Sequence, residues 1–226
     1  MSGYSPVAFG AAAGYGLGWI IWVVTGRLVS GYRSQQTSSQ EVAPAEEADA
    51  GSISLGAAFV PATMALWGGY VGWQASSAAV AASALVITGL LLSLSLVDFQ
   101  VRRLPNPLVL ALVGWAVVQS LWLGSPTLAM AALGLAVAGG IFLLLSILGR
   151  GALGMGDVKL AAAIGALAGF PVALIGLFVG IIAGGVAALF LLLTRRTGRK
   201  DTMAYGPYLA LGAWLVLIRV LGLWPK

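Results

Sequence analysis

The stretch PVALIGLFVGIIAGGVAALFLLL, residues 171–193, contains no charged residue and is long enough to cross a lipid bilayer as a helix. Similar runs recur along the chain. Hydrophobic residues make up 60% of the sequence and charged residues only 8%, far outside the range of soluble domains. A transmembrane barrel needs short strands of alternating polarity, and these long runs do not alternate. The sequence therefore predicts an all-α, polytopic bundle of transmembrane helices.

About eight crossings are expected, at about 20 residues per crossing. The sixth is short and runs into Pro171, so we expect a half-length or tilted helix there. The predicted crossings are 7–28, 54–73, 77–97, 106–123, 126–148, 157–170, 171–193 and 206–223.

Two of the predicted helices carry glycines at four-residue spacing, which puts the glycines on one face and lets helices approach closely. We assign these glycines to packing alone. They are Gly10, Gly14, Gly18, Gly176, Gly180 and Gly184.

The lysines and arginines predict the orientation in the membrane. With eight crossings, only Arg219 and Lys226 fall on one side, and that side is placed outside together with the N-terminus. The net charge of +5 follows from this topology, and no basic stripe with interleaved aromatic residues points to nucleic acid. The residues on the predicted cytoplasmic side are Arg27, Arg33, Arg102, Arg103, Arg150, Lys159, Arg195, Arg196, Arg199 and Lys200.

Residues 30–52 form the longest polar stretch, rich in Ser, Gln and Glu. Such a composition does not bury a core, so a flexible cytoplasmic loop is expected. The whole chain, residues 1–226, is predicted to be one integral membrane domain with no soluble domain.

The residue types that are missing narrow the chemistry. The chain has no His and no Cys, which excludes the usual zinc sites, cysteine nucleophiles and Ser-His pairs. Asp98 and Asp157 are the only acidic residues in or beside the hydrophobic runs. An ionisable group at a helix centre costs about 2.5–3.5 kcal/mol in the bilayer, and less near the interface. Two such acids in one chain suggest a pair with a catalytic role.

Two neighbouring carboxyl groups can cleave a peptide without a metal. They repel each other, so one keeps a proton while the other stays ionised. The ionised group takes a proton from water, and the protonated group hydrogen-bonds the scissile carbonyl and later helps to protonate the leaving amine.

Each aspartate also has a purely structural interpretation. Asp157 opens a predicted helix and is suited to capping it. Asp98 is one turn before Arg102 and Arg103, which could neutralise it. A pairing between the two acids does not follow from their spacing in the sequence.

The segment Gly154-Met155-Gly156-Asp157-Val158-Lys159-Leu160 closely resembles the Gly-x-Gly-Asp signature of prepilin peptidases, a family of aspartic membrane proteases. Asp98 with the downstream Leu104-Pro105-Asn106 resembles the first catalytic aspartate of the family and its following motif. Tyr205-Gly206-Pro207-Tyr208 resembles the start of the last helix of the family.

The resemblance implies that Asp98 and Asp157 are the catalytic pair and that Gly154, Gly156 and Lys159 support them. It leaves Pro105, Asn106, Gly206 and Pro207 as substrate-binding or structural motif residues. The implied substrates are prepilins or pseudopilins with a hydrophobic N-terminal helix. Their basic leader would be cut after a glycine at the cytoplasmic face of the bacterial inner membrane.

One departure from the family pattern concerns the region between the first two helices. Many members carry there a zinc-binding domain with two Cys-x-x-Cys pairs that is linked to N-methylation of the product. Here the cysteine-free loop 30–52 takes that place. No metal is therefore expected, and S-adenosylmethionine is implied as a cofactor only if a methyltransferase activity is retained.

The alternative function is a polytopic transporter or channel in which the two acids relay protons or bind cations. Carboxylates near the middle of the membrane, in broken helices, would suit that role. Both aspartates are instead predicted at the cytoplasmic edge.

Overall fold

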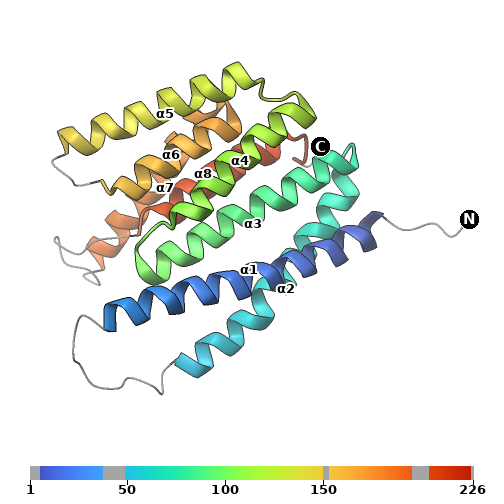
Figure 1. Ribbon diagram of the computed structural model, residues 1–226, viewed down its shortest axis with the longest axis horizontal. Helices are drawn as coiled ribbons and strands as arrows, with labels where there is room; N and C mark the ends of the chain where they lie inside the picture. The colour runs from blue at the N-terminus through green and yellow to red at the C-terminus, as the bar shows by residue number, and fades with distance from the viewer. Residues whose placement is uncertain (1–5, 38–48, 150–152, 195–203, 225–226) are drawn as a thin grey trace, which may run out of the picture. The chain divides into compact units, whose positions relative to one another are not determined.

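The computed structural model describes residues 6–37, 49–149, 153–194 and 204–224. These residues form helices joined by short connections, and no strand occurs among them (Figure 1). The prediction of an all-α fold is confirmed. The helices are α1 (Pro6–Thr37), α2 (Asp49–Gln74), α3 (Ala78–Val101), α4 (Asn106–Leu123), α5 (Leu128–Leu148), α6 (Met155–Ala168), α7 (Val172–Leu193) and α8 (Gly206–Val220).

Five of the described helices, namely α1, α3, α4, α5 and α7, are long and apolar enough to cross a membrane. The protein is therefore a multi-pass membrane protein. Helix α6 has 14 residues and a length of about 21 Å, whereas the hydrocarbon core is about 30 Å thick. The short sixth helix was expected, and eight full crossings and the side of the N-terminus stay predictions.

The predicted loop 30–52 includes residues that belong to helices at both of its ends. Helix α1 continues to Thr37 and α2 begins at Asp49, while residues 38–48 lie outside the described part of the chain. Within α1 the hydroxyls of Ser30 and Ser34 donate to the carbonyls of Arg27 and Gly31. Helix α1 thus continues beyond its apolar span, because hydropathy indicates the part of a helix that suits the bilayer and not the residue at which the helix ends.

The chain divides into two compact units, Met1–Gly89 and Leu90–Lys226. In the first unit α1 and α2 pack backbone to backbone. A Cβ placed on Gly10 would overlap Gly68, and one on Gly18 would lie 2.6 Å from Cα of Pro61. The glycine spacing therefore serves close packing, as predicted. The prediction of a single membrane domain stays a prediction.

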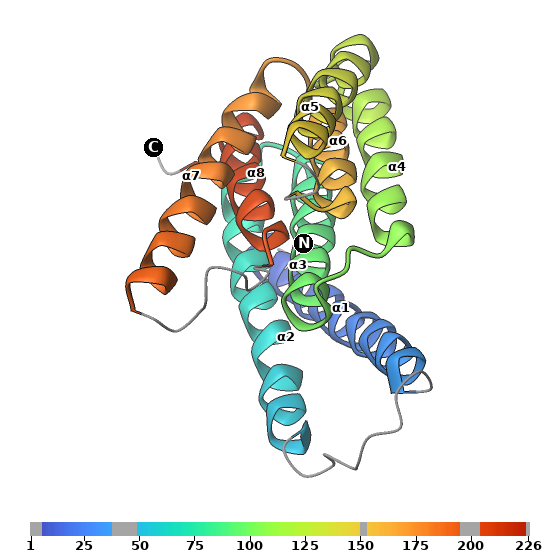
Figure 2. The ribbon, with the colours of Figure 1, turned by 90° about the vertical axis from the view of Figure 1, so that its left-hand side faces the viewer.

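In the second unit α6 packs against α4, α5, α7 and α8 (Figure 2). A Cβ on Gly134 of α5 would overlap Gly165 of α6, so these two helices also touch through their backbones. The buried amide of Gln119 in α4 donates to the Leu167 carbonyl of α6 at 3.4 Å. Helix α6 is therefore held on several sides despite its short length.

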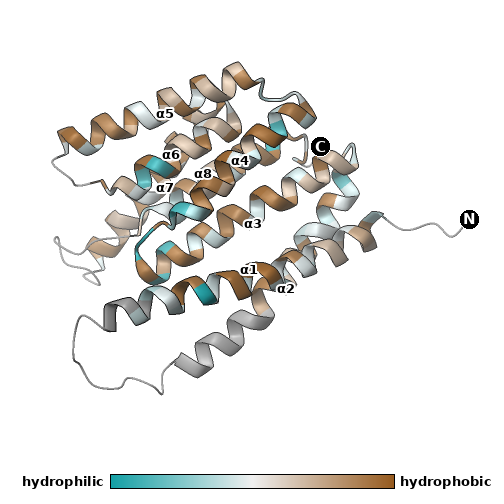
Figure 3. Cartoon of the chain, viewed as in Figure 1, coloured by the Kyte–Doolittle hydropathy of each residue, from teal (hydrophilic) through white to brown (hydrophobic). Residues whose placement is uncertain are grey.

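The last turn of α3 and the first turns of α4, α6 and α8 lie at the same end of this unit (Figure 1). Hydrophilic residues gather at that end, along the end of α3 and the beginnings of α4 and α6 (Figure 3). The fold therefore brings together at one end three sequence segments that are far apart in the chain.

Candidate active site

Asp98 lies in the last turn of α3 and is only 5% exposed. The helix ends three residues later, and Arg102 follows with a φ of 53°, in the left-handed region that commonly ends a helix. The side chains of both Arg102 and Arg103 are exposed. Burying a carboxyl group is costly unless hydrogen bonds compensate for the lost water. The hydrogen-bond partners of Asp98 therefore indicate its role.

The partner of Asp98 is the first amide of α8. The backbone N–H of Gly206 donates to Oδ2 of Asp98 at 3.0 Å, although Gly206 comes 108 residues later in the chain. Tyr205, the N-cap residue of α8, forms no capping hydrogen bond with its own side chain. The carboxylate of Asp98 therefore caps α8 from another helix, where unpaired amides and the helix dipole favour negative charge.

Gly206 is required for this close approach. A Cβ on Gly206 would lie 2.7 Å from Oδ2 and 3.1 Å from Cγ of Asp98. Pro207 follows at the second position of α8, where the missing N–H of proline costs no helical hydrogen bond. These two motif residues thus form the helix start that receives Asp98.

Asp157 lies in the first turn of α6, three residues after the N-cap residue Gly154. Its carboxylate hydrogen-bonds to the backbone of Gly154. Asp157 therefore helps to cap its helix, as one of the two interpretations of the sequence predicted. The charge of Asp98 also acts on Asp157, so the two carboxyl groups lie within electrostatic range of each other.

The glycines beside Asp157 provide space and not an unusual backbone conformation. Gly154 has φ −67° and ψ 144°, which any residue can adopt, so its backbone conformation does not require glycine. Gly156 packs against the connection between α3 and α4, and a Cβ on it would lie 3.1 Å from Cδ1 of Leu104. The small size of Gly156 thus brings the start of α6 close to the segment that follows Asp98.

Lys159 and Asn106 join the starts of α6 and α4. The ammonium group of Lys159 donates to Oδ1 of Asn106 at 2.9 Å, and both side chains are exposed. Pro105 is the buried N-cap residue of α4. The partner of Lys159 was not foreseen, because the two residues are 53 positions apart.

Tyr205 is a residue of this site that the sequence analysis quoted only as part of a motif. Its hydroxyl donates to the carbonyl of Ile181 in α7 at 3.1 Å. Burial and the negative charge of Asp157 raise the pKa of the Tyr205 phenol. Tyr205 therefore lies within range of Asp157, while the residue after it binds Asp98.

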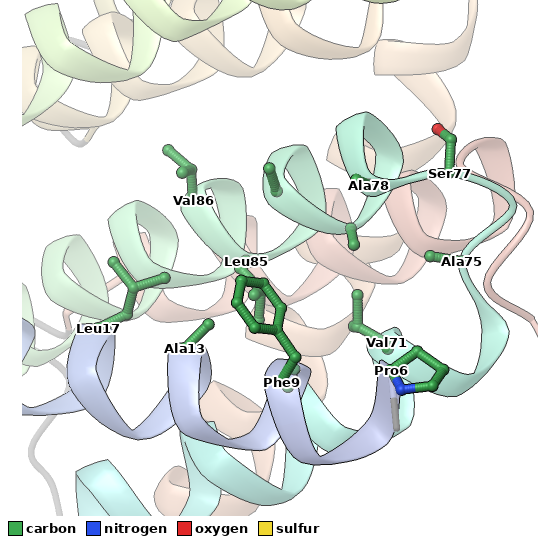
Figure 4. Close-up of a pocket in the computed structure, with 15 residues that line it drawn as sticks. Pro6, Phe9, Ala13, Leu17, Val71, Ala75, Ser77, Ala78, Leu85 and Val86 are labelled. Carbon is green, nitrogen blue, oxygen red and sulfur yellow. The ribbon is translucent and has the colours of Figure 1, made fainter. Parts of the chain in front are cut away.

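A separate cavity of about 390 Å³ lies in the first unit, between α1, α2 and the beginning of α3 (Figure 4). Its lining is almost entirely apolar, with residues such as Phe9, Leu17, Val71 and Leu85, and it contains no acidic or basic side chain. The cavity is therefore not suited to acid–base chemistry.

Groups of three or more His, Cys, Asp or Glu side chains that could hold a metal are absent from the described residues. The chemical groups at the candidate site are two carboxyl groups, one phenol and one ammonium group.

Comparison with known proteins gives a family match. Residues 85–189 match the type IV leader peptidase family. The prepilin leader peptidase/N-methyltransferase of Pseudomonas aeruginosa is 30% identical over 167 residues, which cover 68% of this chain and 55% of that protein. The protein of the same name from Neisseria gonorrhoeae is 32% identical over 154 residues, or 66% of this chain and 52% of that protein.

A third such protein, from Aeromonas hydrophila, is 32% identical over 144 residues. The chain thus spans about half the length of the curated relatives it matches. No solved structure matches it. The predicted resemblance is confirmed, and the matched segment contains Asp98, Asp157 and the residues between them.

Proposed function

Since residues 85–189 belong to the type IV leader peptidase family, we propose that this chain is an aspartic endopeptidase that removes the leader of prepilins or pseudopilins. The cut falls after a glycine, between a basic leader and a hydrophobic helix. Asp98 and Asp157 are the catalytic residues. The names of the relatives, which are prepilin leader peptidases, support this substrate class.

One observation carries the proposal. Two carboxyl groups from distant parts of the sequence lie at the same end of the second unit, where α3 stops and α6 and α8 begin (Figure 1). A structural role alone would not require them to share a site, because each has its own backbone partner. Like charges in one place are costly unless one of them is neutralised by a proton.

In the proposed reaction one carboxyl group is ionised and the other is protonated, and the pair titrates as a unit. The ionised group takes a proton from water, and the water oxygen attacks the scissile carbonyl carbon. The protonated group donates a hydrogen bond to the carbonyl oxygen. The C–N bond of the tetrahedral intermediate then breaks, and the leaving amine takes up a proton from a carboxyl group.

The other motif residues form the helix starts around this pair. Gly206 and Pro207 begin the helix whose first amide holds Asp98. Gly154 and Gly156 form the start of α6, Lys159 links α6 to Asn106 of α4, and Pro105 is the N-cap residue of α4. A shift of the reacting groups by about 1 Å can cost about a hundredfold in rate, so the support that Gly206 gives to Asp98 is expected to matter most.

The proposed setting is the bacterial inner membrane, with the N-terminus outside and the acid pair at the cytoplasmic face. The positions of Lys and Arg support this orientation. Peptide cleavage requires no cofactor in this scheme. S-adenosylmethionine enters only if the chain, like its relatives, carries an N-methyltransferase activity, and the absence of cysteine argues against a zinc-dependent form of it.

The test is incubation of the full chain, in membranes, with a substrate that carries a basic leader, a glycine and a hydrophobic helix. Mass spectrometry of the products is expected to show one cut after the glycine. With S-adenosylmethionine added, a gain of one methyl group on the new N-terminus would reveal methylation. No cleavage by correctly inserted protein, together with substrate-independent proton flux in liposomes, would support a transporter instead.

A further inference from the structure

The helix pair α7 and α8 is joined through three glycines of α7, and the last of them has a different neighbour from the others. A Cβ on Gly176 would meet the backbone of Gly212 and Ala213 in α8, and one on Gly180 would meet the backbone of Tyr208 and Leu209. At these two positions the helices touch backbone to backbone.

At the third position, Gly184, helix α7 contacts the aromatic ring of Tyr205. A Cβ on Gly184 would lie 2.5 Å from Cε2, 3.0 Å from Cζ and 3.2 Å from Cδ2 of Tyr205. The next residue, Gly185, has nothing within 4 Å of such a Cβ. Gly184 therefore forms a notch for one ring, and its neighbour in the sequence faces open space.

The ring of Tyr205 is held at its hydroxyl as well as at its edge. The hydroxyl donates to the Ile181 carbonyl at 3.1 Å, less than one helical turn from the notch. Two contacts with the same stretch of α7 fix both the position and the direction of the side chain. Helix α7 therefore holds the side chain of Tyr205 directly before α8 begins.

The residue that follows Tyr205 holds the first acid. The Gly206 N–H belongs to the peptide unit that joins the two residues, and it donates to Oδ2 of Asp98 at 3.0 Å. A peptide unit is planar and rigid. A movement of the Tyr205 Cα and carbonyl group therefore moves this N–H as well.

We propose that Tyr205 is a positioning residue for Asp98 and that Gly184 provides the space for the Tyr205 ring. Helix α7 thereby fixes one carboxyl group of the acid pair without touching it. This inference rests on the proposed peptidase function for its kinetic test. It has a second test that does not need activity.

The kinetic test compares Gly184→Ala with Gly185→Ala, a neighbouring position on the same helix. In Gly184→Ala the methyl group displaces the ring, so kcat is expected to fall about 10- to 100-fold while KM changes less than threefold. Gly185→Ala is expected to keep the wild-type values. Equal rates in the two variants would overturn the inference, whereas absence of cleavage by the wild type would count against the peptidase function itself.

A double variant separates positioning from a general packing defect. In a Tyr205→Ala background there is no ring to displace, so adding Gly184→Ala is expected to lower kcat less than twofold further. Gly180→Ala is the control, because it disturbs the same helix pair at Leu209 and Tyr208 and its effect is expected to multiply with that of Tyr205→Ala. A full multiplicative effect of Gly184→Ala would contradict the role of Tyr205.

Thermal unfolding in detergent gives the readout that is independent of activity. Asp98→Ala removes the acceptor of the Gly206 N–H and is expected to lower the Tm. If Tyr205 places that N–H, Asp98→Ala lowers the Tm less in the Tyr205→Ala background than in the wild-type chain. Equal decreases in the two backgrounds would show that the Asp98–Gly206 bond forms without Tyr205, and would overturn the inference.

Discussion

Helix α6 begins with a carboxylate from its own first turn, whereas α8 begins with a carboxylate that comes from α3. Asp157 bonds back to Gly154, within four residues of sequence, and Asp98 reaches Gly206 across 108 residues. Both arrangements satisfy amides at a helix N-terminus, where negative charge is favoured. The first is local and survives on its own, but the second exists only when α3 and α8 are packed together. We therefore expect the start of α8 to be the more sensitive half of the site.

The largest effect is expected from Asp98→Asn and Asp157→Asn. Each substitution removes the acid but keeps an oxygen that accepts a hydrogen bond, so insertion and folding are expected to persist. Cleavage of a leader substrate should fall by about 10³-fold or more in either variant, because general acid–base catalysis contributes about 10²–10⁴-fold.

The double variant is expected to be no slower than each single one, since residues that act as a unit are not additive. Asp98→Ala is the structural control. It leaves the Gly206 N–H without its acceptor and should cost about 1–3 kcal/mol of stability, which Asp98→Asn should not. Cleavage within tenfold of wild type in either Asn variant would remove that residue from the catalytic pair.

The comparison of the two helix starts is sharpened by Gly206→Ala and Gly154→Ala. The added methyl group lies 2.7 Å from Oδ2 of Asp98 in the first variant but 3.4 Å from Oδ2 of Asp157 in the second. We expect Gly206→Ala to lower kcat about 10- to 100-fold, because the carboxyl group must shift. Gly154→Ala is expected to change kcat less than threefold, since 3.4 Å is an ordinary contact. The reverse order would mean that α6 is the more sensitive start.

A smaller effect is expected from Gly156→Ala. Its methyl group would lie 3.1 Å from Cδ1 of Leu104, which can rotate away, and 3.2 Å from Cβ of Leu104, which moves only with the backbone. We expect kcat to decrease about three- to tenfold. Leu104→Ala in the same chain should restore part of the rate, because it opens the space that the methyl group needs. No recovery in the double variant would place the cause of the loss elsewhere in α6.

The difference between the two starts also explains what could be predicted from the sequence. The uncharged run 171–193 predicted α7 (Val172–Leu193) closely, because membrane helices are set by local apolar length. The position of Asp157 in a first turn was likewise predicted from its own neighbours. The Asp98–Gly206 bond was not, because it depends on how α3 and α8 pack. The contact between the Tyr205 ring and Gly184 was not predicted for the same reason, although the glycine spacing and the tyrosine motif could both be read from the sequence.

The smallest effect is expected at the bond between Lys159 and Asn106, which links the starts of α6 and α4 at the surface. An exposed hydrogen bond of this kind contributes about 0.5–1 kcal/mol. In a double-mutant cycle of Lys159→Met and Asn106→Ala, the unfolding free energies should therefore show a coupling of that size. Cleavage should change less than fivefold in each variant, since neither side chain is placed against the carboxyl groups. A loss of cleavage as large as that of Asp157→Asn, with unfolding unchanged, would show that Lys159 takes part in the reaction, and α6 would then contribute more than one group to the chemistry.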